Sequence, residues 1–187
     1  MIFNKLKKLD FSFLFVVTII SIIGFLALYS ASNGSFEPWA KKQIIRFLIF
    51  FILLIIISLI DIKFIYKHGY TIFFFCFILL ASVEIAGTFG LGARRWIKIF
   101  GISIQPSELI KITIIIALSK YYHDLKFENI GKITNIIVPL IIILFPSIFV
   151  LIQPDLGTSI MIFLLGLSIM FVAGTRIWQF IVGLIIL

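Results

Sequence analysis

The chain has 187 residues, of which 62% are hydrophobic and 13% charged, and its mean hydropathy is +1.25. This composition excludes a water-soluble globular domain, because too few polar residues are present to cover a water-facing surface. The formal net charge of +8 suits anionic lipid head groups. Basic residues are scattered between apolar segments and form no continuous stripe of the kind that nucleic acid requires. We therefore predict an all-α polytopic membrane protein that binds no nucleic acid.

Six apolar segments are predicted to be complete membrane-spanning helices, since a span needs roughly 20 mainly apolar residues. In chain order they are 11–31, 44–60, 69–86, 106–122, 136–152 and 157–173. An apolar run of eleven residues, 177–187, follows them and is too short to cross a bilayer. We interpret it as the start of a seventh span. The chain is accordingly expected to be the N-terminal part of a longer protein, with 1–187 forming a single transmembrane domain; the alternative for 177–187 is a short re-entrant helix.

The distribution of lysine and arginine predicts that the N-terminus is cytoplasmic. With Met1 inside, the inner loops hold nine basic residues: Lys5, Lys7, Lys8, Lys63, Lys67, Lys120, Lys126, Lys132 and Arg176. The outer loops hold five: Lys41, Lys42, Arg94, Arg95 and Lys98. An excess of positive charge on the inner side is the usual arrangement. The segment 87–107 is then an extracytoplasmic loop that leads into the fourth helix.

Ionisable residues gather at one place in this apolar chain. Arg94, Arg95, Lys98, Glu108 and Lys111 all lie within 94–111. Charged groups in or beside hydrocarbon are costly, so such a cluster is a functional-site hypothesis by default. We predict that the site of this protein, if it has one, is here.

The sequence QPSE that opens the fourth helix has two interpretations. Pro106 and Glu108 are typical of a helix start, where a missing N–H costs nothing and an acid suits the helix dipole. Lys111 lies three residues after Glu108 on the same helix face, and a buried pair of this kind seldom stabilises relative to apolar residues. We favour a cavity-facing functional pair. The alternative is a structural pair that ties the helix to a neighbour, with Glu84 as a candidate partner.

The adjacent arginines also have two interpretations. Guanidinium groups bind phosphates through two parallel hydrogen bonds. Arg94 and Arg95 could instead anchor the chain at the membrane interface beside Trp96. Taken together with Lys98 and Lys111, they favour a site for an anionic lipid-linked ligand such as a pyrophosphate.

The other polar residues give weaker indications of a binding or catalytic role. Asp155 precedes the sixth span and is interpreted mainly as its N-cap. The sequence contains no spacing typical of metal ligands, no nucleophile–base motif and no phosphate-binding loop.

Two separate segments resemble the SEDS family (shape, elongation, division and sporulation). The first contains GARRWI and QPSE, with Lys111 three residues after the glutamate, and the second is QPDLGTS at 153–159. The resemblance covers the whole chain in order of spans. The DLGTS form is more similar to the elongation branch of the family than to its division branch.

The resemblance implies a ten-span glycosyltransferase of the bacterial plasma membrane that polymerises lipid II for cell elongation and rod shape. Its partner would be a class B penicillin-binding protein. By similarity, Arg94, Glu108 and Lys111 would line a substrate-binding cavity open to the outer side, with Arg95 in the same group. The essential acid of the family lies in a loop after the seventh span. No catalytic residue is therefore assigned within this chain, which is expected to be inactive alone.

In the mechanism that the resemblance implies, the acid deprotonates the acceptor hydroxyl, which attacks the donor's anomeric carbon. Arg94 and Lys111 would stabilise the departing pyrophosphate, with a divalent cation as an optional addition and no other cofactor.

Two alternatives remain open. A transporter, or flippase, of lipid-linked precursors would also use such charges and proline-bent helices. The chain could also be a non-catalytic remnant of a split gene.

Overall fold

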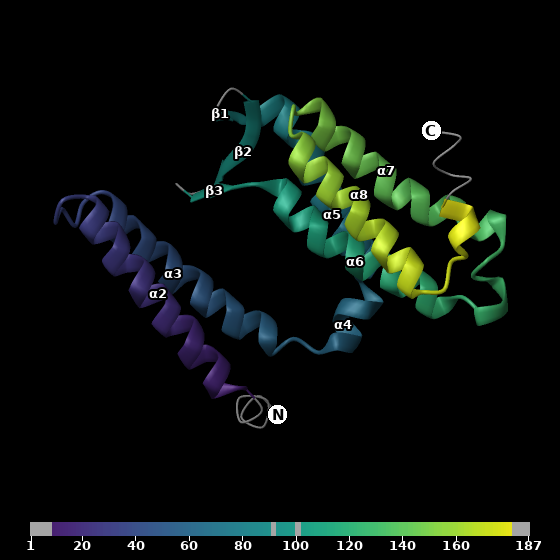
Figure 1. Cartoon of the computed structure of the whole chain (residues 1–187), viewed down its shortest axis with the longest axis horizontal. Helices are drawn as coiled ribbons and strands as arrows, with labels where there is room; N and C mark the ends of the chain where they lie inside the picture. Colours follow the sequence, from purple (N-terminus) through teal and green to yellow (C-terminus); the bar gives the residue numbers. More distant parts are fainter. Residues whose placement is uncertain (1–8, 91–92, 100–101, 181–187) are drawn as a thin grey trace. The chain divides into compact units, whose positions relative to one another are not determined.

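The structure is a computed structural model that describes residues 9–90, 93–99 and 102–180. Contacts within the chain group it into two compact units, Met1–Ile62 and Lys63–Leu187. Figure 1 shows the elements of both units. The single transmembrane domain over 1–187 stays a prediction.

The first unit is a pair of long helices, α2 (Phe11–Ala31) and α3 (Trp39–Ser58). Asp10 is the N-cap of α2, and its carboxylate accepts a hydrogen bond from the Phe13 N–H at 3.1 Å. A short connection makes the two helices antiparallel neighbours. None of the residues of α2 is buried, as expected for a helix whose apolar surface faces lipid.

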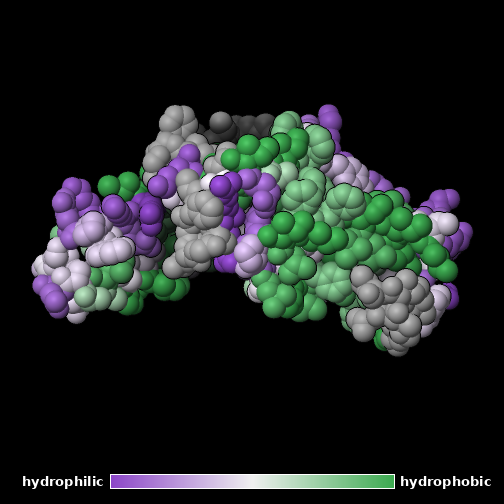
Figure 2. All heavy atoms as spheres, turned by 90° about the horizontal axis from the view of Figure 1, so that it is seen from above, coloured by the Kyte–Doolittle hydropathy of each residue, from purple (hydrophilic) through white to green (hydrophobic). Residues whose placement is uncertain are grey.

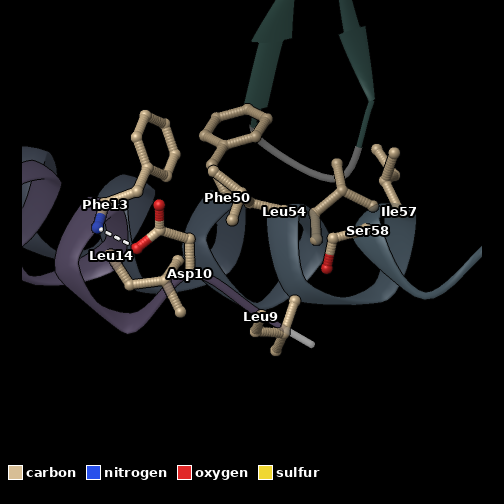
Figure 3. A pocket seen from close by; sticks show the side chains of 9 residues that line it. Leu9, Asp10, Phe13, Leu14, Phe50, Leu54, Ile57 and Ser58 are labelled. Atoms are coloured by element: carbon tan, nitrogen blue, oxygen red, sulfur yellow. Dashed lines mark hydrogen bonds between the residues drawn. The ribbon is translucent and has the colours of Figure 1, made fainter. Parts of the chain in front are cut away.

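A cavity of about 630 Å³ lies between the start of α2 and the last turns of α3 (Figure 3). Leucine, isoleucine and phenylalanine side chains form most of its lining, with Asp10 and Ser58 as the polar contributors. The Asp10 carboxylate already caps α2. This cavity therefore lacks the clustered charges expected of a site for an anionic ligand.

The second unit is a helical bundle. It contains the short helix α4 (Ile62–Lys67), followed by α5 (Gly69–Ala86), α6 (Pro106–Asp124), α7 (Ile137–Ile152) and α8 (Leu156–Val172). Short 3₁₀ turns, η1 (Phe127–Asn129) and η2 (Ile133–Asn135), connect α6 to α7. The core centres on α6, whose Ile110, Ile114 and Leu118 are fully buried against α5, α7 and α8. On the face shown in Figure 2, hydrophobic residues gather in a broad green area on the right.

Close contact between α7 and α8 depends on small residues. Gly166 of α8 lies so near Ile143 of α7 that an added Cβ would stand 2.4 Å from the isoleucine Cγ1. Nearby, the buried Ser159 hydroxyl donates to the Ser147 carbonyl oxygen at 2.7 Å. Small side chains and interhelical hydrogen bonds of this kind are what hold helices together where both are surrounded by apolar groups.

The segment 87–107, treated as a loop in the sequence analysis, contains a small antiparallel sheet. Its strands are β1 (Thr88–Gly90), β2 (Ala93–Ile99) and β3 (Ile102–Ile104), with β2 in the middle. Successive residues of a strand point to opposite faces. On β2, Arg94, Trp96 and Lys98 are exposed, whereas Arg95 and Ile97 are partly buried. The sheet therefore separates the two adjacent arginines.

The prediction of an all-α polytopic bundle is confirmed: the described residues contain six long helices at the predicted places. By length and composition alone, α2 and the stretch 133–152 can cross a membrane, and α5 and α8 contain shorter apolar helices. The second helix begins at Trp39 and not at residue 44, because the turn that carries Lys41 and Lys42 is also helical. Of the predicted seventh span, residues 177–180 are helical, and 181–187 lie outside the described residues.

At the end of the bundle where α6 finishes, contacts fasten α4 to α6. The Tyr66 hydroxyl donates to the Asp124 carboxylate, and this hydrogen bond raises the pKa of Tyr66. Lys120 Nζ donates to the Lys67 carbonyl oxygen at 2.8 Å and lies over the rings of Tyr66 and Tyr70. Asp124 and Lys120 thus each have a partner on α4, at the end of the bundle away from the sheet.

Candidate functional site

The charged residues singled out from the sequence lie at one end of the second unit. Here α5 ends at Ala86, α6 begins at Pro106, and a tight turn at 153–155 joins α7 to α8. Strand β2 contacts both α5 and α6, and the sheet is drawn beside this end of the bundle (Figure 1). We name this end the sheet end. It brings residues from four helices and one strand to the same level of the bundle.

Arg94 projects from the exposed face of β2. Its Nη1 donates to the Glu84 carbonyl oxygen at 3.2 Å. That oxygen is among the last four carbonyls of α5, which have no partner within the helix and carry the negative end of its dipole. This bond differs from the tie between Glu84 and the Glu108–Lys111 pair that the sequence left open, which stays a prediction.

Glu108 and Lys111 form the predicted pair on the first turns of α6. Lys111 Nζ lies 2.8 Å from Glu108 Oε1. Pro106 occupies the start of the helix, as predicted. The lysine side chain is 20% exposed and the glutamate side chain 56% exposed, so the pair faces open space and the lysine is its inner member.

Arg95 points to the other side of β2 and binds the turn between α7 and α8. Its Nε donates to the Gln153 carbonyl oxygen at 3.2 Å, and its Nη2 donates to the Pro154 carbonyl oxygen. Its Nη1 lies 3.6 Å from Asp155 Oδ2. These three contacts use the whole guanidinium fork, and the side chain is 27% exposed. The sequence had placed Arg95 with the substrate-binding group.

Asp155 has two roles at this turn. One oxygen, Oδ1, accepts from the Thr158 N–H at 3.2 Å and caps α8, as the sequence predicts. The other oxygen pairs with Arg95. The aspartate side chain is only 15% exposed, so the charge of Arg95 is matched close to the protein interior.

Gln153 completes the arrangement and was not singled out from the sequence. It is 4% exposed, and its Nε2 donates to the Leu80 carbonyl oxygen of α5 at 3.4 Å. The Gln153 carbonyl oxygen accepts the hydrogen bond from Arg95 Nε. The sequence indication for Gln153 was its place in the QPDLGTS motif, where a polar residue begins the turn between two apolar helices.

Three cations at the sheet end are of the kind that anion sites use. Lys98 and Arg94 share the exposed face of β2, and Lys111 lies on α6, which β2 contacts. Fixed cations of this kind bind phosphate groups through charge-assisted hydrogen bonds. Within 9–90, 93–99 and 102–180, no group of three or more His, Cys, Asp or Glu side chains could hold a metal ion. A divalent cation at this site stays a proposal.

Residues 10–187 match the model of the FtsW/RodA/SpoVE family, described as cell cycle proteins. The chain belongs to this family. The resemblance to SEDS proteins inferred from GARRWI, QPSE and QPDLGTS is thereby confirmed.

Among curated proteins, the chain is similar to two named probable peptidoglycan glycosyltransferase FtsW. It is 38% identical to the protein of Buchnera aphidicola subsp. Baizongia pistaciae, over 80% of this chain and 39% of the relative. It is 31% identical to the protein of Escherichia coli O6:H1, over 95% of this chain and 45% of the relative. The chain thus spans less than half the length of these relatives.

Solved structures show the same fold. The rod shape determining protein RodA of Thermus thermophilus superposes with a TM-score of 0.79 at 25% identity, covering 94% of this chain and 57% of that protein. A chain from a peptidoglycan synthase complex gives the same score and identity, covering 94% of this chain and 51% of its own length.

Proposed function

We propose that this chain is the lipid II-binding part of a SEDS peptidoglycan glycosyltransferase. The observation that carries the proposal is the cation arrangement at the sheet end, where the lysine of the Glu108–Lys111 pair and the exposed Arg94 belong to neighbouring elements. Family membership and the relatives' names supply the reaction. The substrate would be bound by its undecaprenyl pyrophosphate.

The reaction assigns a role to each of these residues. The acceptor's sugar hydroxyl attacks the anomeric carbon of the donor, the new glycosidic bond forms, and the bond between that carbon and the pyrophosphate oxygen breaks. Negative charge develops on the departing pyrophosphate, and Arg94 and Lys111 stabilise it. Glu108 orients the Lys111 ammonium through its hydrogen bond. The proton of the attacking hydroxyl goes to a carboxylate that acts as general base, which we place outside these residues.

The relatives' names favour the division branch of the family. Both curated relatives described above are named FtsW, although the DLGTS form resembles the elongation branch and a RodA structure shares the fold. We therefore propose a role in septal wall synthesis ahead of the role in elongation and rod shape inferred from the motif.

Partner and location follow from the same proposal. A class B penicillin-binding protein is the expected partner, supported by the likeness to a chain of a peptidoglycan synthase complex. The protein would lie in the bacterial plasma membrane with its N-terminus in the cytoplasm. That orientation places the sheet end on the outer side, where polymerisation takes place.

The test is binding of fluorescent lipid II to the chain in liposomes, with a class B penicillin-binding protein present. We expect Arg94→Ala and Lys111→Ala each to weaken binding about 10-fold or more, because each removes a charge-assisted hydrogen bond. Lys126→Ala is the matched control. It deletes an exposed cation at the other end of the same unit and should leave binding unchanged.

Unchanged binding in both site variants would refute the assignment. The same liposomes are assayed for glycan polymer, which distinguishes a polymerase from a transporter because a transporter makes no new bond. We expect no polymer from this chain. Polymer would instead show that a working acid lies within it, and Glu108 and Asp155 would be the first residues to replace.

A further inference from the structure

Arg95 is held at the sheet end by three groups. Its guanidinium reaches two backbone carbonyls and one carboxylate, all in the turn 153–155. Each of the three guanidinium nitrogens thus has a partner in this turn, so the planar fork is held in one orientation. The neighbouring Arg94 lies on the opposite, exposed face of the same strand.

The turn that holds Arg95 is itself firmly placed. Gln153 is buried and bonded to α5 through the Leu80 carbonyl oxygen. Asp155 is bonded to the first turn of α8 through the Thr158 N–H. Arg95 therefore connects β2 to α5 and α8 through groups that are already fixed.

We propose that Arg95 is a positioning residue, which clamps β2 to the α7–α8 turn through Asp155 and so presents Arg94 to the pyrophosphate. Arg95 makes no contact with the ligand. This inference rests on the proposed function, because it concerns how the lipid II site is held. It differs from the assignment of Arg95 to the substrate-binding group that the sequence suggested.

Asp155→Asn tests the clamp without disturbing the helix. Asparagine is as good an N-cap as aspartate, so the bond to Thr158 is kept while the charge opposite Arg95 is removed. Asp155 lies behind the strand, so a loss of binding in this variant must act through other residues. Loss of a partly buried charge partner also lowers stability, so thermal unfolding is measured in parallel and binding is compared at a temperature at which both chains are folded.

The experiment measures fluorescent lipid II binding to the full chain in liposomes, in a double-mutant cycle. Asp155→Asn should weaken binding several-fold, and Arg95→Ala about 10-fold. Arg95→Lys should lie between Arg95→Ala and wild type, because lysine can pair with Asp155 but cannot reproduce the fork. In an Arg94→Ala background, Asp155→Asn should have no further effect, since residues that act through one another are not additive.

Two outcomes would overturn the proposal. In the first, Asp155→Asn weakens lipid II binding by the same factor in the wild-type and Arg94→Ala backgrounds, which would mean that the clamp does not act through Arg94. The other is normal binding by Asp155→Asn together with a large loss in Arg95→Ala, which would make Arg95 a direct ligand. The proposed function fails separately, by normal binding in Arg94→Ala and Lys111→Ala, so the two failures can be distinguished.

Discussion

Removal of one charge from the Glu108–Lys111 pair should affect ligand binding far more than stability. At the observed separation of 2.8 Å, two unit charges attract by about 1.5 kcal/mol in the dielectric of water. The glutamate side chain is 56% exposed, so screening and side-chain entropy reduce the net contribution to less than about 1 kcal/mol. A fully buried pair would behave differently, and loss of one partner would then cost about 3–5 kcal/mol.

Glu108→Gln and Lys111→Met are the appropriate substitutions, because each removes a charge and keeps most of the side-chain volume. We expect the melting temperature of the detergent-solubilised chain to fall by no more than about 2–4 °C in either variant. Lipid II binding should fall about 10-fold or more in Lys111→Met, with a smaller loss in Glu108→Gln.

The contrary result is a large loss of stability in both variants, with binding reduced only in proportion to the unfolded fraction. That outcome would favour the structural pair left open in the sequence analysis. It would also remove Lys111 from the proposed site while leaving Arg94 to be tested separately.

Two further predictions concern the contact between α7 and α8 and are measured as free energies of unfolding. The Gly166→Ala variant should be about 1–3 kcal/mol less stable than the Gly157→Ala variant. The new Cβ at 166 overlaps the buried Ile143 side chain, whereas nothing lies within 4 Å of a Cβ at 157. Equal stabilities of the two variants would contradict the close packing of α7 and α8. Ser159→Ala should lower stability by about 1 kcal/mol, because it removes a buried hydrogen bond between two helices. Ser168→Ala should change stability little, because this exposed hydroxyl bonds only within its own helix. Equal losses of stability in the two variants would contradict the role of Ser159 in joining α7 to α8.

The helices were the most predictable part of the fold. In the apolar segments, local hydropathy and length are enough to predict a helix. The helix predicted at 69–86, for example, coincides with α5, Gly69–Ala86. Pro106 fixed the start of α6, and the spacing of Glu108 and Lys111 predicted their contact, because both depend on helix geometry within one turn.

The sheet could have been suspected but was missed. Its outer strands have three residues each, which is too short for a periodic pattern to be recognised. Within β2, exposed residues 94, 96 and 98 alternate with partly buried residues 95 and 97. The adjacent Arg94 and Arg95 therefore looked equivalent in the sequence, although on a strand they must face opposite ways.

The partner of Arg95 was beyond the reach of local patterns. The acceptors Gln153 and Pro154 lie 58 and 59 residues further along the chain. No spacing rule links positions so far apart, and only the packing of α5, α7 and α8 brings the turn to the strand.

That separation has a consequence for biosynthesis. A ribosome adds about 5–20 residues per second, so the turn at 153–155 is made about 3–12 s after β2. During this interval the Arg95 guanidinium lacks the partners that it has in the folded bundle. The contacts of Arg95 at the sheet end therefore cannot form until the turn at 153–155 has been synthesised. A slow step in the insertion of α7 and α8 would delay the formation of the anion site, even though every cation assigned to it had been synthesised long before.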